Sequence, residues 1–308
     1  MEPDLRGLER THIIPLISTL CKGPLGIAQL PRFWWKNLLH QAGQLDAVYP
    51  HNSGGLDRWV VEILSLDMDR TQAHIWNNKP DYLQFEDWVH EHGTVDRTRI
   101  ERWNKSLLTR THVAPNKIDE TYADIGYAKE ETTEVDAVLL NCLQDWQLYW
   151  QRCGQKDLNG SGTPFPPLIS SIDRGPMGIC QLPRTWLKTC LRAKGLLHSA
   201  YPDCADGSLD ERCINTLQLD RDKTLSHLRG NAPTYLEFEA WVRQEAVIDT
   251  GAIMEFNERL LSRQHIPAKI EDIHRTIGRP NDGAWISGVL LNHLEDWKYA
   301  HTALTSKN

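Results

Sequence analysis

The chain has 308 residues, of which 40% are hydrophobic and 24% are charged, and its formal net charge is −7. This composition is typical of globular proteins, and the acidic balance excludes nucleic acid as the main partner, because phosphate binding needs concentrated lysine and arginine. No apolar run reaches the roughly 18 residues of a membrane-spanning helix, so we expect no membrane contact. Acidic residues stand at positions 2 and 4, where a secretory signal would be basic. We therefore expect a cytoplasmic protein.

Apolar residues recur at helical spacing along the chain, and strand-like alternation is missing. The first predicted helix begins at Leu30-Pro31, because proline suits the first helical turn, and it ends before Gly43. Other helices are expected to begin at acidic residues that can cap them or at proline. In order, these helices cover 56–64, a segment from Asp67 or Asp69, a segment from Pro80, a segment from Thr94 or Asp96 to Arg110, 118–125, and 132–152.

The chain repeats itself at a domain-sized interval. Residues 23–36 read GPLGIAQLPRFWWK and residues 175–188 read GPMGICQLPRTWLK, and matched positions continue to the end of the chain. Such a period far exceeds the roughly 20 to 50 residues of solenoid repeats. We predict an all-α chain of two tandem homologous helical domains related by a pseudo-two-fold axis. Residues 1–153 form the first half, 154–166 a linker, and 167–308 the second half.

An ordered series of residues is shared by the two halves. In the first half it is Leu30-Pro31-Arg32, Lys36, Gly43, Tyr49, Leu56-Asp57, Leu66-Asp67, Trp88-Val89, Asp96 and Asn104. In the second half it is Leu182-Pro183-Arg184, Lys188, Gly195, Tyr201, Leu209-Asp210, Leu219-Asp220, Trp241-Val242, Asp249 and Asn257. This series resembles the small single-copy bacterial proteins catalogued as domain of unknown function 5069. The resemblance implies the tandem architecture, and it carries over no site residue, because the family has no established activity. The family has a tryptophan before the shared asparagine. The first half matches it with Trp103, whereas the second half has Phe256 at this position.

A pair of cations recurs in both halves, as Arg32 with Lys36 and as Arg184 with Lys188. The spacing of four residues places both charges on one helix face near the helix N-terminus, where a carboxylate or phosphate can bind. The alternative is an internal ion pair, in which Arg32 contacts an aspartate of its own half. The aspartates considered are Asp57 and Asp67.

Four histidines are shared by the halves: His74 with His227, and His112 with His265. Each could act as a general base or bind a metal, or it could cap a helix or bridge packed helices. No metal or cofactor is specified, because the chain lacks Walker A, GxGxxG, GxSxG and HExxH motifs. The seven cysteines form no CxxC pair and none recurs in the other half, which predicts neither a disulfide framework nor a duplicated zinc site.

Twelve tryptophans are present, and those found in only one half could line a ligand cavity. Trp35, Trp59 and Asn104 are the candidates that accompany the cation pair. Because the aromatic sets differ between the halves, we expect one working cavity, in or beside the first half. The favoured function is a small-molecule enzyme of bacterial specialised metabolism that acts on an aromatic or apolar organic acid, either a cofactor-free or a metal-dependent oxygenase or isomerase. The alternative is a non-catalytic bivalent binding or scaffold protein, and a homodimer remains open.

Overall fold

The computed structural model describes residues 13–128, 134–154 and 164–306. In these residues the regular secondary structure is helical, with isolated β-bridges and no strands, so the prediction of an all-α chain is confirmed. The helices of the first half are α1 (Leu30–Gln41), α2 (Leu56–Ile63), α3 (Met68–Asn78), α4 (Tyr82–His92), α5 (Arg97–Leu108), α6 (Pro115–Ile125) and α7 (Ala137–Tyr149), followed by a π-helical turn, η1 (Trp150–Gly154). Those of the second half are α8 (Leu182–Ala193), α9 (Leu209–Thr216), α10 (Arg221–Asn231), α11 (Tyr235–Glu245), α12 (Thr250–Leu261), α13 (Pro267–Ile277) and α14 (Gly288–Thr305). Within the described ranges, no helix is both long and apolar enough to cross a membrane.

Most of the predicted helix starts follow from capping residues. Asp67 caps α3 and Asp96 caps α5, each by accepting hydrogen bonds from backbone N–H groups of the first turn. The predicted start at Pro80 is wrong by two residues, because Asp81 caps α4 in a capping box with Gln84. Pro80 therefore precedes the N-cap and lies outside the helix.

Two later boundaries also differ from the prediction. Helix α6 begins at Pro115 instead of residue 118. Helix α7 begins at Ala137 instead of residue 132, because the Asp136 carboxylate accepts from the backbone N–H groups of the first turn. Of the predicted linker 154–166, residues 155–163 lie outside the described residues, and Phe165 forms a parallel β-bridge with Leu197.

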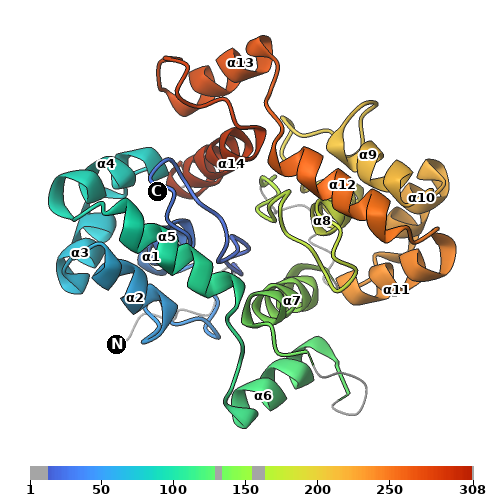
Figure 1. Ribbon diagram of the computed structural model, residues 1–308, viewed down its shortest axis with the longest axis horizontal. Helices are drawn as coiled ribbons and strands as arrows, with labels where there is room; N and C mark the ends of the chain where they lie inside the picture. The colour runs from blue at the N-terminus through green and yellow to red at the C-terminus, as the bar shows by residue number, and fades with distance from the viewer. Residues whose placement is uncertain (1–12, 129–133, 155–163, 307–308) are drawn as a thin grey trace, which may run out of the picture.

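The helices form two lateral groups with two long helices between them. Helices α1 to α5 gather on one side and α8 to α12 on the other, whereas α7 and α14 lie in the centre (Figure 1). Helices α6 and α13 project at opposite ends of this view. The central position of α7 and α14 places both against each lateral group.

Each central helix packs against the lateral group of the other half. Helix α14 packs against α4, and the Trp297 ring meets Tyr82 edge-on at 4.5 Å between centroids. Helix α7 packs against α11, and Trp146 meets Tyr235 in the same way at 4.7 Å. Both tryptophans are fully buried. Large buried aromatics contribute strongly to packing free energy, so the two halves share one core.

Candidate functional site

The predicted binding cations of the first half lie in buried ion pairs. Arg32 Nη1 and Nη2 contact the two oxygens of Asp145 at 2.6 and 3.1 Å. The Tyr49 hydroxyl donates to the same carboxylate at 2.7 Å. Lys36 Nζ lies 2.6 Å from Asp57 Oδ2, and both side chains are almost fully buried. The two cations therefore have counter-charges within the chain.

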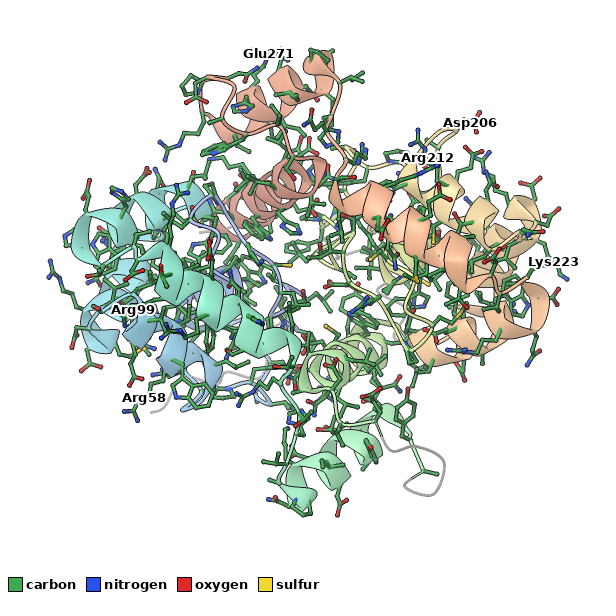
Figure 2. The ribbon with its side chains drawn as sticks, in the orientation of Figure 1. Arg58, Arg99, Asp206, Arg212, Lys223 and Glu271 are labelled. Atoms are coloured by element: carbon green, nitrogen blue, oxygen red, sulfur yellow. The ribbon has the colours of Figure 1, made fainter. Side chains whose placement is uncertain are left out.

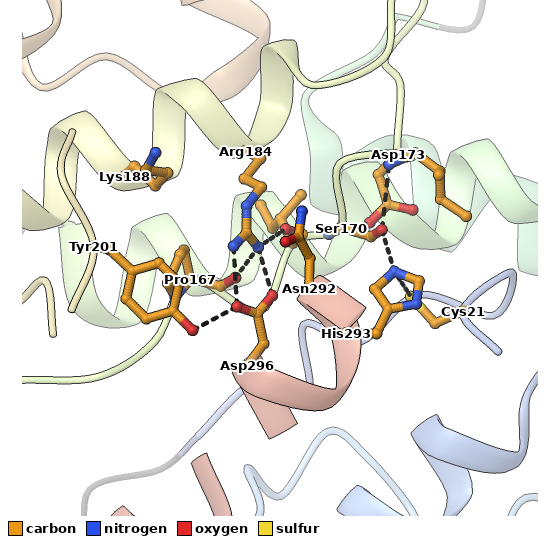
Figure 3. Close-up of polar contacts among 12 residues, drawn as sticks. Cys21, Pro167, Ser170, Asp173, Arg184, Lys188, Tyr201, Asn292, His293 and Asp296 are labelled. Carbon is orange, nitrogen blue, oxygen red and sulfur yellow. Dashed lines mark hydrogen bonds and ion pairs between the residues drawn. The ribbon is translucent and has the colours of Figure 1, made fainter. Parts of the chain in front are cut away.

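The second half repeats this arrangement. Arg184 Nη1 and Nη2 contact Asp296 at 2.7 and 3.0 Å, and Tyr201 donates to that carboxylate at 2.7 Å (Figure 3). Lys188 forms a close ion pair with Asp210. Burial opposes the charge on Arg184, but the Asp296 carboxylate outweighs it and raises the pKa of the guanidinium.

These contacts correct the predicted partner of Arg32. It pairs with Asp145, whereas Asp57 pairs with Lys36 and Asp67 caps α3. A substrate carboxylate would have to displace a buried aspartate from a two-point contact, which leaves that aspartate without its counter-charge in the core. The structure therefore does not support the assignment of the four cations as substrate-binding residues, and it gives them a role in holding helices together.

The first pair of shared histidines lies on the outer helices. His74 stacks on Trp88 with ring centroids 4.5 Å apart, and its Nδ1 lies 3.1 Å from Asn78 Nδ2. His227 stacks on Trp241 at 4.4 Å in the same manner. Partial burial lowers the pKa of both imidazoles and so favours their neutral form. Their contacts are with packed side chains of their own half.

The second pair follows α5 and α12. His265 Nε2 lies 2.8 Å from Asn292 Oδ1 and its Nδ1 lies 3.0 Å from Arg263 Nη2. Because the guanidinium can only donate, Nδ1 accepts and Nε2 donates, so the imidazole is neutral. Burial lowers the pKa of His265 and also that of His112. His265 therefore orients Arg263.

The remaining predicted residues contact protein atoms. Trp35 is fully buried, and its ring lies 6.2 Å from that of Phe165. Asn104 accepts from the Ala28 N–H at 2.9 Å and donates to the Gly26 carbonyl, which fixes the loop before α1. Trp59 is 37% exposed and stacks under the Arg110 guanidinium. Sequence reasoning placed these three residues at a cavity, and none of them lines either of the two cavities described below.

A polar cluster lies where the halves meet. The Ser170 hydroxyl contacts His293 Nε2 at 2.5 Å, and Cys21 Sγ lies 3.8 Å from the same nitrogen (Figure 3). Burial lowers the pKa of His293 to about 4 and raises the pKa of Cys21 to about 12. Cys21 is therefore a thiol and not a thiolate, and a buried thiol is unreactive. The cluster joins the halves and offers no accessible nucleophile.

A groove of about 580 Å³ lies between α9 and α12. Its lining residues are Leu209, Arg212, Asn215, Thr216, Gln218, Ala252, Glu255, Phe256, Arg259, Leu260 and Arg263. Figure 2 places Arg212 on this side of the molecule and Arg58 and Arg99 on the opposite side. Volumes of roughly 300 to 1,000 Å³ are typical of small-molecule sites.

Two arginines of the groove lack a counter-charge. Neither Arg212 nor Arg263 forms an ion pair with any residue in the described part of the chain. Burial, and then the positive charge of Arg212, lower the pKa of Arg263. Like charges at short range repel one another. An anion placed between the two guanidinium groups would remove that repulsion.

The equivalent surface of the first half is closed. Trp59 takes the place of Arg212, and the Arg110 guanidinium lies over its ring at 4.7 Å. Arg99 takes the place of Ala252 and reaches across from α5 to the backbone carbonyl of Glu62 on α2 at 3.1 Å. A stacked indole and a bridging arginine therefore fill the space that is open in the second half.

Sequence reasoning missed Arg212 and Arg263 as site residues. The exchange of Trp59 for Arg212 is the signal present in the sequence, but from the sequence alone it favours a cavity in or beside the first half. The groove lies on the second half and another cavity borders the first half, so the cavity expected in or beside the first half stays a prediction. At the place in the first half that corresponds to the groove, Trp59 packs against Arg110 instead of lining an empty space.

Among the described residues, no group of three or more histidine, cysteine, aspartate or glutamate side chains could hold a metal ion, and Cys21, Cys142, Cys180, Cys190, Cys204 and Cys213 are free thiols. Comparison with known protein families, curated proteins and solved structures finds no match. The groove therefore carries the functional interpretation.

Proposed function

We propose that this chain recognises a small organic acid with an aromatic or apolar body in the groove between α9 and α12. The observation that carries the proposal is the pair of arginines without a counter-charge above an apolar floor. A carboxylate matches the planar guanidinium in a two-point contact. Leu209, Phe256 and Leu260 would bury the apolar body.

The proposal is one of recognition, and the oxygenase or isomerase reaction expected from the sequence is not part of it. The polar groups of the groove are guanidinium, amide and hydroxyl groups, with one carboxylate, Glu255, that pairs with Arg259. Guanidinium and amide groups bind anions but do not transfer protons near neutral pH.

We also propose that the halves are homologous domains related by a pseudo-two-fold axis, with the bounds given by the sequence, and that the chain is related to domain of unknown function 5069. The matched contacts support this. Arg32 with Asp145 corresponds to Arg184 with Asp296, and each half sends its last long helix against the other. On this basis the groove predicts one organic acid bound per chain, which disfavours a bivalent scaffold with two equal surfaces.

Isothermal titration calorimetry with 2-naphthoate and with 2-naphthylmethanol, which has the same body without the charge, tests the proposal. We expect the acid to bind at one site per chain and the alcohol to bind much more weakly. Arg212→Gln and Arg263→Gln should each weaken binding of the acid about 10- to 150-fold, which corresponds to the about 1.5–3 kcal/mol of a charge-assisted hydrogen bond. Arg58→Gln is the matched control, because Arg58 is an exposed arginine on the other half. Equal affinity for acid and alcohol, or equal effects of the three variants, would overturn the proposal.

A further inference from the structure

A second cavity, of about 300 Å³, lies between α4 and the segment that joins α13 to α14. Its lining residues are Pro24, Leu25, Leu83, Glu86, Asp87, His90, Arg279, Pro280, Asp282 and Trp285. Both halves contribute, and an ion pair between Arg279 and Asp87 spans the boundary between them. The cavity therefore exists only because the halves pack together.

Glu86 is the least exposed polar group of this lining, with 4% of its surface accessible. Its Oε1 accepts from the Tyr82 hydroxyl at 2.6 Å and its Oε2 from the Leu25 N–H at 3.1 Å. Gly23 permits this close packing, since a Cβ there would lie 2.4 Å from Oε1. No lysine, arginine or histidine forms an ion pair with Glu86 among the residues that the structure describes.

The equivalent carboxylate of the second half, Glu239, has an additional ion-pair partner. Glu239 accepts from the Tyr235 hydroxyl at 2.8 Å, as Glu86 does from its own tyrosine, but it also pairs with Arg243 at 2.8 Å. His90 occupies the position of Arg243 in the first half, four residues after Glu86 on the same face of α4. The first half thus keeps the buried carboxyl and leaves a cavity beside it where the second half has an arginine.

We propose that this cavity binds a small organic cation, with an ammonium or amidinium group on a flat apolar body, and that Glu86 is its counter-ion. Carboxylate groups outnumber cations in the lining, since Arg279 is already paired with Asp87 and Asp282 remains. Trp285 supplies an aromatic wall, and a cation close to an indole face is attracted by the ring electrons. The inference concerns a different site from the groove and does not depend on the organic acid bound there.

Binding of a cation should be linked to the proton on Glu86. Burial raises the pKa of this carboxyl to about 8, against the opposing hydrogen bonds from Tyr82 and Leu25. A bound cation favours the ionised carboxylate, so binding at neutral pH releases a proton and affinity rises as pH increases towards about 8. The other charged or titratable groups that face Glu86 across the cavity or along α4 are Tyr82, Asp87, His90, Arg279 and Asp282.

Calorimetric titration with benzamidine, and with benzamide as its neutral isostere, tests the inference. We expect benzamidine to bind the full chain and benzamide to bind much more weakly. His90→Arg introduces the cation that the second half already has, and it should weaken benzamidine binding at least about tenfold by occupying Glu86. Glu86→Gln should have a similar effect and should remove the pH dependence. His90 is exposed, so its variant keeps the fold even if the buried substitution at Glu86 does not.

His92→Arg is the control for added charge, because it places the same side chain on α4 outside the residues that line the cavity. It should leave benzamidine affinity within about twofold of the unmodified chain, because exposed surface charges contribute little interaction free energy. Three results would each overturn the inference: no benzamidine binding, equal binding of benzamide, or equal effects of His90→Arg and His92→Arg. None of them bears on naphthoate binding in the groove.

Discussion

Substitution of Asp296 by alanine should destabilise the chain strongly. The side chains of Arg184 and Asp296 are only 7% and 3% exposed, and two hydrogen bonds of 2.7 and 3.0 Å join them. Removal of the carboxylate leaves a buried guanidinium without a counter-charge, and it leaves the Tyr201 hydroxyl without an acceptor. Loss of one partner of a buried ion pair costs about 3–5 kcal/mol, and an unsatisfied buried hydroxyl adds about 1 kcal/mol.

Urea unfolding followed by tryptophan fluorescence and circular dichroism would measure this cost, provided that the two signals coincide. We expect a loss of about 4–6 kcal/mol in the free energy of unfolding, a large part of the 5–15 kcal/mol typical of folded domains. Glu62→Ala is the matched control, because it breaks an exposed ion pair with Arg58 that should contribute less than about 1 kcal/mol. The double variant Arg184→Met/Asp296→Leu should recover much of the loss, since no buried charge remains. Equal costs for Asp296→Ala and Glu62→Ala would refute the reasoning.

Three further predictions concern stability. Burial lowers the pKa of His293 from 6.5 to about 4, so the unfolded chain binds this proton more tightly than the folded chain. The contribution of neutral His293 to stability is therefore present above pH 6.5 and is lost as the pH falls towards 4. Melting temperatures measured across this range should decline with pH, and His293→Asn should reduce that decline. Gly175→Ala should destabilise the chain in thermal melts, because the new Cβ would lie 2.3 Å from Glu239 Oε2. Asp220→Ala removes the side-chain acceptor for the Lys223 N–H at the start of α10 and should cost about 1 kcal/mol in urea unfolding.

Local signals predicted the helices well where one residue decides the boundary. Asp67 and Asp96 were expected as caps and serve as caps, because the carboxylate reaches backbone N–H groups two or three residues away. The predicted start at Pro80 is wrong because the neighbouring Asp81 carboxylate accepts from the Gln84 N–H and sets the boundary two residues later. Competition between neighbouring residues is not visible in apolar periodicity.

Contacts between residues far apart in the sequence could not be predicted from local sequence patterns. Arg32 and Asp145 are 113 residues apart, and nothing in their immediate sequence links them. One hint is present in the sequence, because Arg32, Tyr49 and Asp145 all recur in the second half. It could show that the residues matter together but not that they touch, because pairing depends on how the last helix of each half returns to the first.

The groove between α9 and α12 could not be predicted from the sequence either. Its existence depends on what fills the same place in the first half, where Arg99 bridges two helices and Trp59 stacks under Arg110. The exchange of these residues for Ala252 and Arg212 is visible in the sequence. Whether it removes packing or adds a binding group follows only from the three-dimensional arrangement.

The most direct test of the account grafts the closed surface of the first half onto the second. The triple variant Arg212→Trp/Ala252→Arg/Phe256→Trp should fold, because the first half accommodates these side chains at the equivalent positions. Calorimetric titration with 2-naphthoate should then show no binding to a variant whose melting temperature is close to that of the unmodified chain. Unchanged affinity for 2-naphthoate in the folded variant would show that the acid binds elsewhere, and it would contradict the assignment of the groove as the functional site.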